Sequence, residues 1–77
     1  MNVSELKAEI ARVGATYRGI AVELGISEQA LYNKLNKKTE FKGSEIKKLA
    51  SMLSLTMDKV NYIFFGGEVN IIHQEGA

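Results

Sequence analysis

The chain has 77 residues, of which 45% are hydrophobic and 25% charged, and its formal net charge is +1. These proportions are ordinary for one small globular domain and exclude wholesale disorder. The absence of cysteine excludes a disulfide scaffold or a cysteine zinc site, and a single histidine, His73, argues against any metal site.

The sequence also lacks the signals of membrane insertion and secretion. No apolar run approaches the roughly 20 residues of a membrane span. The N-terminal residues Asn2, Ser4 and Glu5 do not follow the basic-then-apolar order of a secretion signal. We therefore expect a cytoplasmic protein that has no membrane segment and no cofactor.

The first helix is predicted over residues 5–13, with Ser4 as its N-cap and Gly14 at its end. Its apolar residues recur at a spacing of three and four, which indicates a single buried stripe. The members of this stripe are Val3, Leu6, Ile10 and Val13.

The run from Tyr17 to Asn36 predicts two short helices joined by a tight turn. The second helix is expected over residues 17–24 with Thr16 as its cap, and Gly25 supplies the positive φ needed past its end. Ser27 can cap the third helix, which is expected over residues 28–35. The apolar residues that hold this pair against the domain are Ile20, Leu24, Ile26 and Leu31. This pattern is typical of a helix-turn-helix, whose second helix usually enters the major groove of DNA.

Basic residues gather after the third helix. Six of the ten cations lie between positions 34 and 48, together with two glutamates, so this window carries +4 and the remainder −3. Such polarity gives the molecule a preferred face for a polyanion. The alternative is a solvated lysine face, which is also the simpler interpretation of Lys47 and Lys48. Residues 37–42 are expected to form a basic loop, and Phe41 within it is expected to fold back onto the core.

A fourth helix is predicted over residues 45–53 with Ser44 as its cap, and a fifth over residues 57–64 with Thr56 as its cap. Residues 1–65 would then form one domain, and residues 66–77 a tail. The β-branched residues of the tail predict a short strand, which could pair with the same strand of a second copy or remain a frayed terminus. The expected dimer contacts are Phe64, Phe65, Val69, Ile71 and Ile72.

Several segments carry a resemblance to a known family: Glu23-Leu24-Gly25-Ile26-Ser27, the run from Leu31 to Lys38, Phe41-Lys42, Glu45-Ile46 and the run from Tyr62 to Phe65. With them, residues 4 to about 65 resemble small phage repressors of the Cro/Xre type, the lambdoid helix-turn-helix class. The chain is similar to short Cro-like regulators of phages and prophages of Gram-positive bacteria.

The resemblance implies an all-α, five-helix, lambda-repressor-like helix-turn-helix domain with a short strand-like C-terminal tail. It also implies a protein of the bacterial host cytoplasm that binds double-stranded operator DNA as a homodimer. Two residues depart from the family pattern. Gly19 lies where a helix former is usual, and Lys34 occupies a place that is apolar in the broader class.

Five residues at the exposed start and middle of the third helix are the expected base contacts: Ser27, Glu28, Gln29, Tyr32 and Asn33. Gln29 and Asn33 suit adenine, because an amide can exchange two hydrogen bonds with its N6 and N7. Glu28 either accepts from cytosine or complements the helix dipole. Tyr32 either contacts DNA or is simply exposed to solvent.

The affinity of such a domain comes mainly from phosphates. One group of expected phosphate contacts lies at the start of the second helix, where free amides suit a phosphate oxygen, and comprises Thr16, Tyr17 and Arg18. The other follows the third helix and comprises Lys34, Asn36, Lys37, Lys38, Thr39 and Lys42.

The leading hypothesis is therefore a sequence-specific DNA-binding transcriptional regulator that acts as a repressor. The alternative is a protein-interaction module of the same fold, which modulates a second regulator protein or acts as an antitoxin-like partner. An enzyme is not expected, because His73 has no nucleophile beside it in the sequence and Gly66-Gly67 lacks the pattern of a phosphate-binding loop. No small-molecule substrate is expected either.

Overall fold

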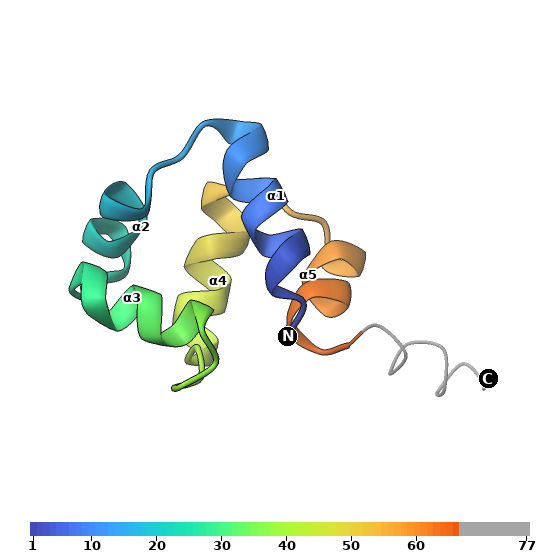
Figure 1. The fold of residues 1–77 in the computed structure, drawn as a ribbon. Helices are drawn as coiled ribbons and strands as arrows, with labels where there is room; N and C mark the ends of the chain where they lie inside the picture. The colour runs from blue at the N-terminus through green and yellow to red at the C-terminus, as the bar shows by residue number, and fades with distance from the viewer. Residues whose placement is uncertain (67–77) are drawn as a thin grey trace.

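In a computed structural model of the chain, which describes residues 1–66, these residues form five α-helices and no strand (Figure 1). The bounds are α1 Val3–Val13, α2 Tyr17–Leu24, α3 Glu28–Leu35, α4 Gly43–Met52 and α5 Met57–Phe64. The prediction of an all-α domain with five helices is confirmed for this part of the chain. The strand predicted in the tail lies outside the described residues.

The helices α2, α3 and α5 begin and end at the predicted residues. Each has a hydroxyl cap at its N-terminus: Oγ1 of Thr16, Oγ of Ser27 and Oγ1 of Thr56 accept a hydrogen bond from the amide three residues on. Such a bond satisfies one of the first amides of a helix, which have no partner within it. A correctly placed hydroxyl is therefore enough to fix the start of these helices.

The predicted starts of α1 and α4 were wrong. Asn2, and not Ser4, caps α1, because Asn2 Oδ1 accepts from the Glu5 N–H at 3.0 Å. The N-cap position of α4 is held by Lys42, whose N–H donates to Glu45 Oε1 at 2.8 Å, so the helix begins before Ser44. This helix also ends one residue earlier than predicted, at Met52.

All five helices contribute side chains to one core. Its largest fully buried members are Leu6, Ile20, Leu31, Leu49, Leu53 and Ile63. Phe41 packs against this cluster from the loop before α4, as predicted. Val13 was expected in the buried stripe of α1, but it is 38% exposed, because it occupies the last turn before Gly14.

Two hydrogen bonds to backbone carbonyls help to hold α1 against the C-terminal part of the domain. The Asn2 N–H donates to the carbonyl oxygen of Ile63 in α5 at 2.6 Å, and Arg12 Nη2 donates to the carbonyl oxygen of Leu53 at 3.0 Å. The second bond satisfies a carbonyl at the end of α4. In Figure 1, α1 accordingly lies beside α5, while α2 and α3 form the opposite side of the molecule. Within residues 1–66, the longest helix has 11 residues, and none has the length and apolar character to cross a membrane.

Candidate nucleic-acid interface

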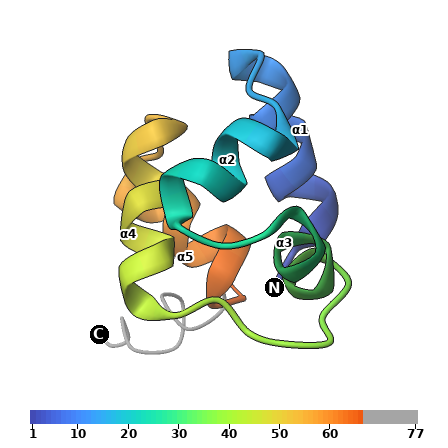
Figure 2. The ribbon, with the colours of Figure 1, turned by 90° about the vertical axis from the view of Figure 1, so that its left-hand side faces the viewer.

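The helices α2 and α3 are joined by a three-residue turn, Gly25–Ser27. Gly25 has φ 71°, in the left-handed region, and the amide after it donates to the carbonyl of Ala21 at 3.0 Å. Only glycine adopts this conformation without a steric penalty from a Cβ, so the glycine in the sequence predicts the turn. Figure 2 shows α2, α3 and the loop that leads from α3 to α4 on the side that faces the viewer.

One side of α3 is buried and the other is open. Leu31 and Leu35 are 1% and 2% exposed, whereas Gln29 and Tyr32 face solvent. On the open side, Gln29 Nε2 donates to Asn33 Oδ1 at 3.1 Å, one helical turn further on. The expected base contacts Gln29, Tyr32 and Asn33 therefore lie together on an uncovered polar face within the described chain.

The start of α2 adjoins the start of α3. Arg18 Nε lies 3.2 Å from Glu28 Oε2, and the rings of Tyr17 and Tyr32 meet edge to face with centroids 5.5 Å apart. The polar face of α3 thus continues onto α2. Arg18 stays open to solvent even in this pair, with its side chain 85% exposed.

Two of the expected DNA contacts already have a structural task. The hydroxyls of Thr16 and Ser27 accept the capping amides of Gly19 and Ala30, each at 3.0 Å. Gly19 also has a reason to be glycine, because a Cβ at this position would lie 3.1 Å from the Thr16 hydroxyl oxygen. Any contact of these threonine and serine hydroxyls with DNA would have to coexist with the cap.

The loop after α3 presents polar side chains on its outside. These exposed residues are Asn36, Lys37, Lys38, Thr39 and Lys42. Lys37 has φ 64°, and the next amide, that of Lys38, donates to the carbonyl of Asn33 at 2.8 Å. Lys37 thus occupies the left-handed position past a helix end at which glycine is usual. The hydrogen bond of the Lys38 amide fixes the direction in which the loop leaves α3.

Lys34, one of the predicted phosphate contacts, does not lie on the surface of the protein. Lys34 points inward, where Nζ lies 3.3 Å from Glu45 Oε1 and donates to the carbonyl of Glu40 at 3.1 Å. Its side chain is only 10% exposed, so the ammonium is held away from the surface. An inward position of α3 is therefore occupied by a charged side chain.

The cations that remain on the surface between positions 34 and 48 are therefore fewer than the sequence suggests. Lys48 Nζ donates to the carbonyl of Glu23, near the end of α2, at 3.3 Å. Lys48 is itself exposed, as are Lys37, Lys38, Lys42 and Lys47. Three of these five belong to the loop that follows α3, and Glu40 in the same loop carries the opposing charge.

Phe64, one of the predicted dimer contacts, also packs within its own chain. Phe64 is half-buried and meets Phe41 edge to face, with ring centroids 5.8 Å apart, so it serves the chain's own core. Phe65 is 52% exposed and is open to a partner. The other expected contacts, Val69, Ile71 and Ile72, lie outside the described residues.

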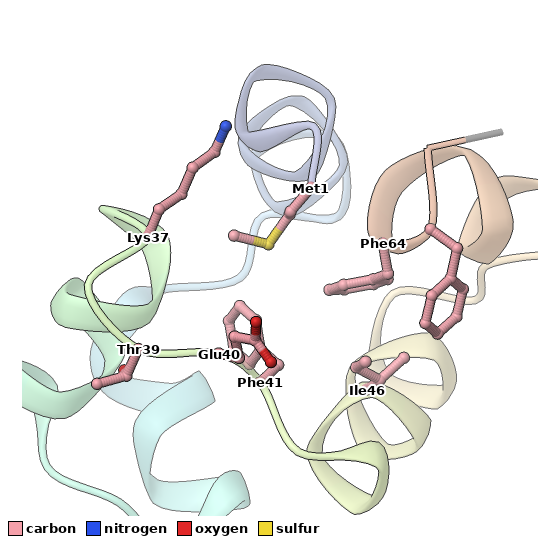
Figure 3. A pocket seen from close by; sticks show the side chains of 8 residues that line it. Met1, Lys37, Thr39, Glu40, Phe41, Ile46 and Phe64 are labelled. Carbon is pink, nitrogen blue, oxygen red and sulfur yellow. The ribbon is translucent and has the colours of Figure 1, made fainter. Parts of the chain in front are cut away.

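A cavity of about 380 Å³ lies between the basic loop and the end of α5 (Figure 3). Its apolar lining includes Met1, Phe41, Ile46 and Phe64, and Lys37 stands at its edge. In residues 1–66, no group of three or more histidine, cysteine, aspartate or glutamate side chains could hold a metal ion. Thr39, Glu40 and Phe65 complete the lining, so the recess beside the polar face is formed by both apolar and polar side chains.

Sequence reasoning missed Glu45. The sequence analysis gave it no role in the site, yet it is buried, accepts a hydrogen bond from the Lys42 amide and pairs with Lys34. The signal that could have revealed it is local. An acidic residue at the third position of a helix commonly reaches back to the amide before the helix, and this predicts an inward-turned carboxylate.

A comparison with protein families finds one match: residues 2–67 fit the family described as "Protein of unknown function (DUF739)". No curated protein and no solved structure matches the chain at a significant level.

Proposed function

The chain belongs to the family described as "Protein of unknown function (DUF739)", and we propose that it is a sequence-specific DNA-binding transcriptional regulator, a Cro-like phage or prophage repressor. In this proposal α2 and α3 form a lambda-repressor-like helix-turn-helix, and α3 enters the major groove of an operator half-site. The observation that carries it is the uncovered polar face of α3, flanked by Arg18 on one side and by the loop lysines on the other.

The dimensions of α3 suit this task. Its eight residues span about 12 Å, enough to reach three or four base edges. Gln29 and Asn33 supply amide groups that complement adenine. Glu28 is held by Arg18 in the free protein, so its charge at the DNA-facing start of α3 is partly neutralised. When Arg18 turns to a phosphate, Glu28 becomes available to accept a hydrogen bond from cytosine N4.

Binding strength would come from the phosphate backbone. Arg18, Lys37, Lys38 and Lys42 are exposed cations on the two sides of α3. One domain offers few such contacts, so we propose that two copies bind half-sites about 34 Å apart. The exposed side chain of Phe65 is available for contact between the copies.

The proposal is tested by selecting bound duplexes from a random pool and measuring the affinity of the selected site against salt concentration. The logarithm of the affinity should fall linearly with the logarithm of salt, with a slope of about −0.9 for each phosphate contact. A chain that enriches no sequence, or whose binding is insensitive to salt, would refute the proposal.

Two substitutions separate base reading from backbone contact. Gln29→Ala should relax preference at one base pair and cost about 1–3 kcal/mol on the selected site only. Lys38→Ala should weaken binding to selected and unrelated duplexes alike. Lys47→Ala removes the same charge from α4, outside the loop, and serves as the control, with little effect expected on either duplex.

A second candidate function rests on the exposed apolar side chains of α5 and its end. Met57, Tyr62 and Phe65 are 74%, 48% and 52% exposed, which favours a contact with another protein. In this alternative the domain modulates a second regulator or acts as an antitoxin-like partner. Co-purification of a specific partner, together with no duplex affinity of the chain alone, would select it over the first proposal.

A further inference from the structure

The helix α3, which is proposed above to enter the major groove, is joined to α4 by a buried ion pair. Lys34 of α3 and Glu45 of α4 have side chains that are 10% and 9% exposed, and Lys34 Nζ lies 3.3 Å from Glu45 Oε1. The same ammonium donates to the carbonyl of Glu40 at 3.1 Å and lies 5.8 Å from the centre of the Phe41 ring. Three partners in the loop and in α4 therefore surround one charge from α3.

The carboxylate of Glu45 has a second contact. Its Oε1 also accepts the N–H of Lys42, the last residue of the loop, at 2.8 Å. The loop of residues 36–42 leaves α3 just after Lys34 and enters α4 just before Glu45 (Figure 2). One carboxylate oxygen thus joins the two ends of this loop, and the Lys34 ammonium also holds its middle at Glu40.

Stability alone does not explain this arrangement. Removing two charges from water costs free energy that their attraction often fails to return, and apolar residues of similar volume are frequently as stable in such places. An ion pair instead constrains the relative positions of the segments that it joins, because its atoms must meet at fixed distances and directions. The loop that is fixed in this way carries three of the exposed cations beside α3, namely Lys37, Lys38 and Lys42.

We propose that Lys34 and Glu45 are positioning residues that hold the basic loop 36–42 in a fixed orientation relative to α3. The loop cations then meet the phosphates in the same pose in which α3 meets the base edges, although neither Lys34 nor Glu45 touches DNA. This inference rests on the proposed function, but its structural part, the fixing of the loop, is measurable without DNA.

The test compares the full-length chain with the double variant Lys34→Met, Glu45→Leu, which replaces the pair by apolar side chains of similar volume. We expect the double variant to fold and its Lys38 amide to exchange with solvent about tenfold faster, because the bond of this amide to Asn33 opens more often. Its affinity should fall about tenfold on selected and random duplexes alike, since a mobile loop must be ordered on binding.

Two further variants keep the test decisive. Lys48→Met removes a lysine that donates to a carbonyl elsewhere, on Glu23, and should leave the exchange of the Lys38 amide unchanged. Should the double variant fail to fold, Glu45→Gln removes the charge but keeps an acceptor for the Lys42 amide, and it should still speed this exchange several-fold.

The outcomes are distinguishable. Unchanged exchange at Lys38 in a folded variant would overturn the inference, and so would an affinity loss confined to the selected sequence, because that loss would place the pair in base reading. If the unaltered chain binds no duplex, the proposed function fails, and the exchange rates alone then decide whether the pair fixes the loop.

Discussion

Lys37 and Ser54 are the residues other than glycine that have a positive φ in the described chain, at 64° and 54°. Each lies just past a helix, and the amide that follows it donates to a carbonyl five residues back, as it does after Gly14 and Gly25. A side chain in this conformation costs about 1 kcal/mol or more relative to glycine. The same strain is therefore present at two helix ends, and only one of them belongs to the candidate interface.

This pair gives a matched prediction. Lys37→Gly and Ser54→Gly should each raise the free energy of unfolding by about 1 kcal/mol, because both remove the same backbone strain. If Lys37 also contacts phosphate, Lys37→Gly should weaken duplex binding while Ser54→Gly leaves it unchanged. Urea unfolding and duplex titrations of both variants measure the two effects. Equal affinities of the two variants would remove Lys37 from the list of phosphate contacts.

Gln29 and Asn33 form a second feature at the scale of single residues. The bond between them uses one N–H of Gln29 and one lone pair of Asn33 Oδ1, and it leaves Gln29 Oε1 as an acceptor and Asn33 Nδ2 as a donor that take no part in it. The pair therefore matches the N6 and N7 of one adenine, with each of the two residues supplying one bond.

We accordingly predict that Gln29→Ala and Asn33→Ala relax preference at the same base pair, and that their losses are not additive. Each single variant should lose about 1–3 kcal/mol on the selected site, and the double variant little more than either. Duplex titrations with all four bases at each position measure this. Independent losses at two different base pairs would show that the amides act separately.

At the scale of the helices, the sequence was most informative where capping residues and apolar spacing agreed. Thr16, Ser27 and Thr56 stand directly before their helices, and all three starts are as predicted. In α1 and α4, Ser4 and Ser44 led to predicted starts that are two residues too late. Asn2 caps α1 instead, and at α4 the Glu45 side chain accepts a hydrogen bond from the amide of Lys42, the N-cap residue. Several side chains near one helix start can satisfy the same amides, and the sequence does not reveal which of them does so.

The candidate site was predictable to the extent that it follows from helical periodicity. The open face of Gln29, Tyr32 and Asn33 follows once Leu31 and Leu35 are placed inside. The inward turn of Lys34 does not follow, because it depends on Glu45, eleven positions later in the chain. Burying the charge of a lysine costs free energy unless the charge is paired. A partner on the far side of a loop does not produce a periodic pattern in the sequence, so this pair could not be predicted from helical spacing.

The caps give a prediction at this scale. Ser27→Ala and Thr56→Ala should each lower the free energy of unfolding by about 1 kcal/mol, because each leaves one helix amide without its acceptor. If the Ser27 hydroxyl serves only the cap, the sequence preference of Ser27→Ala should match that of the unaltered chain. A changed preference at one base pair would instead make Ser27 a base contact. Urea unfolding and repeated duplex selection provide the two measurements.

Across the whole molecule, charges tie the N-terminal helix to the rest. Glu9 accepts from Arg12 Nε at 2.7 Å, and Lys59 of α5 lies 2.8 Å from Glu5 and 3.6 Å from Glu9. The hydrogen bond from Arg12 is the largest cause that lowers the pKa of Glu9 below its ordinary value. The hydrogen bond to Glu5 is the largest cause that raises the pKa of Lys59. This cluster lies on α1 and α5, whereas the polar face proposed to meet DNA belongs to α2, α3 and the loop after α3.

The two shifts set the pH range in which this cluster stabilises the fold. A lowered carboxyl pKa adds stability above the unfolded value, about 4.3, and this is lost as the pH falls through the folded pKa. A raised lysine pKa adds stability below the unfolded value, about 10.4, and this is lost as the pH rises through the folded pKa. We therefore predict that Glu9→Gln is less stable than the unaltered chain at neutral pH, and that the difference narrows in acid.

Lys59→Met should show the opposite dependence on pH. We expect it to be less stable than the unaltered chain at neutral pH, and this difference in stability should narrow in strong alkali. Urea-unfolding midpoints of the three chains across this pH range measure both dependences. A deficit that stays constant at every pH would mean that the variants act through lost packing of α1 on α5, because packing does not titrate. Since these charges are remote from the proposed DNA contacts along the chain, both variants should keep the duplex preference of the unaltered chain wherever they remain folded.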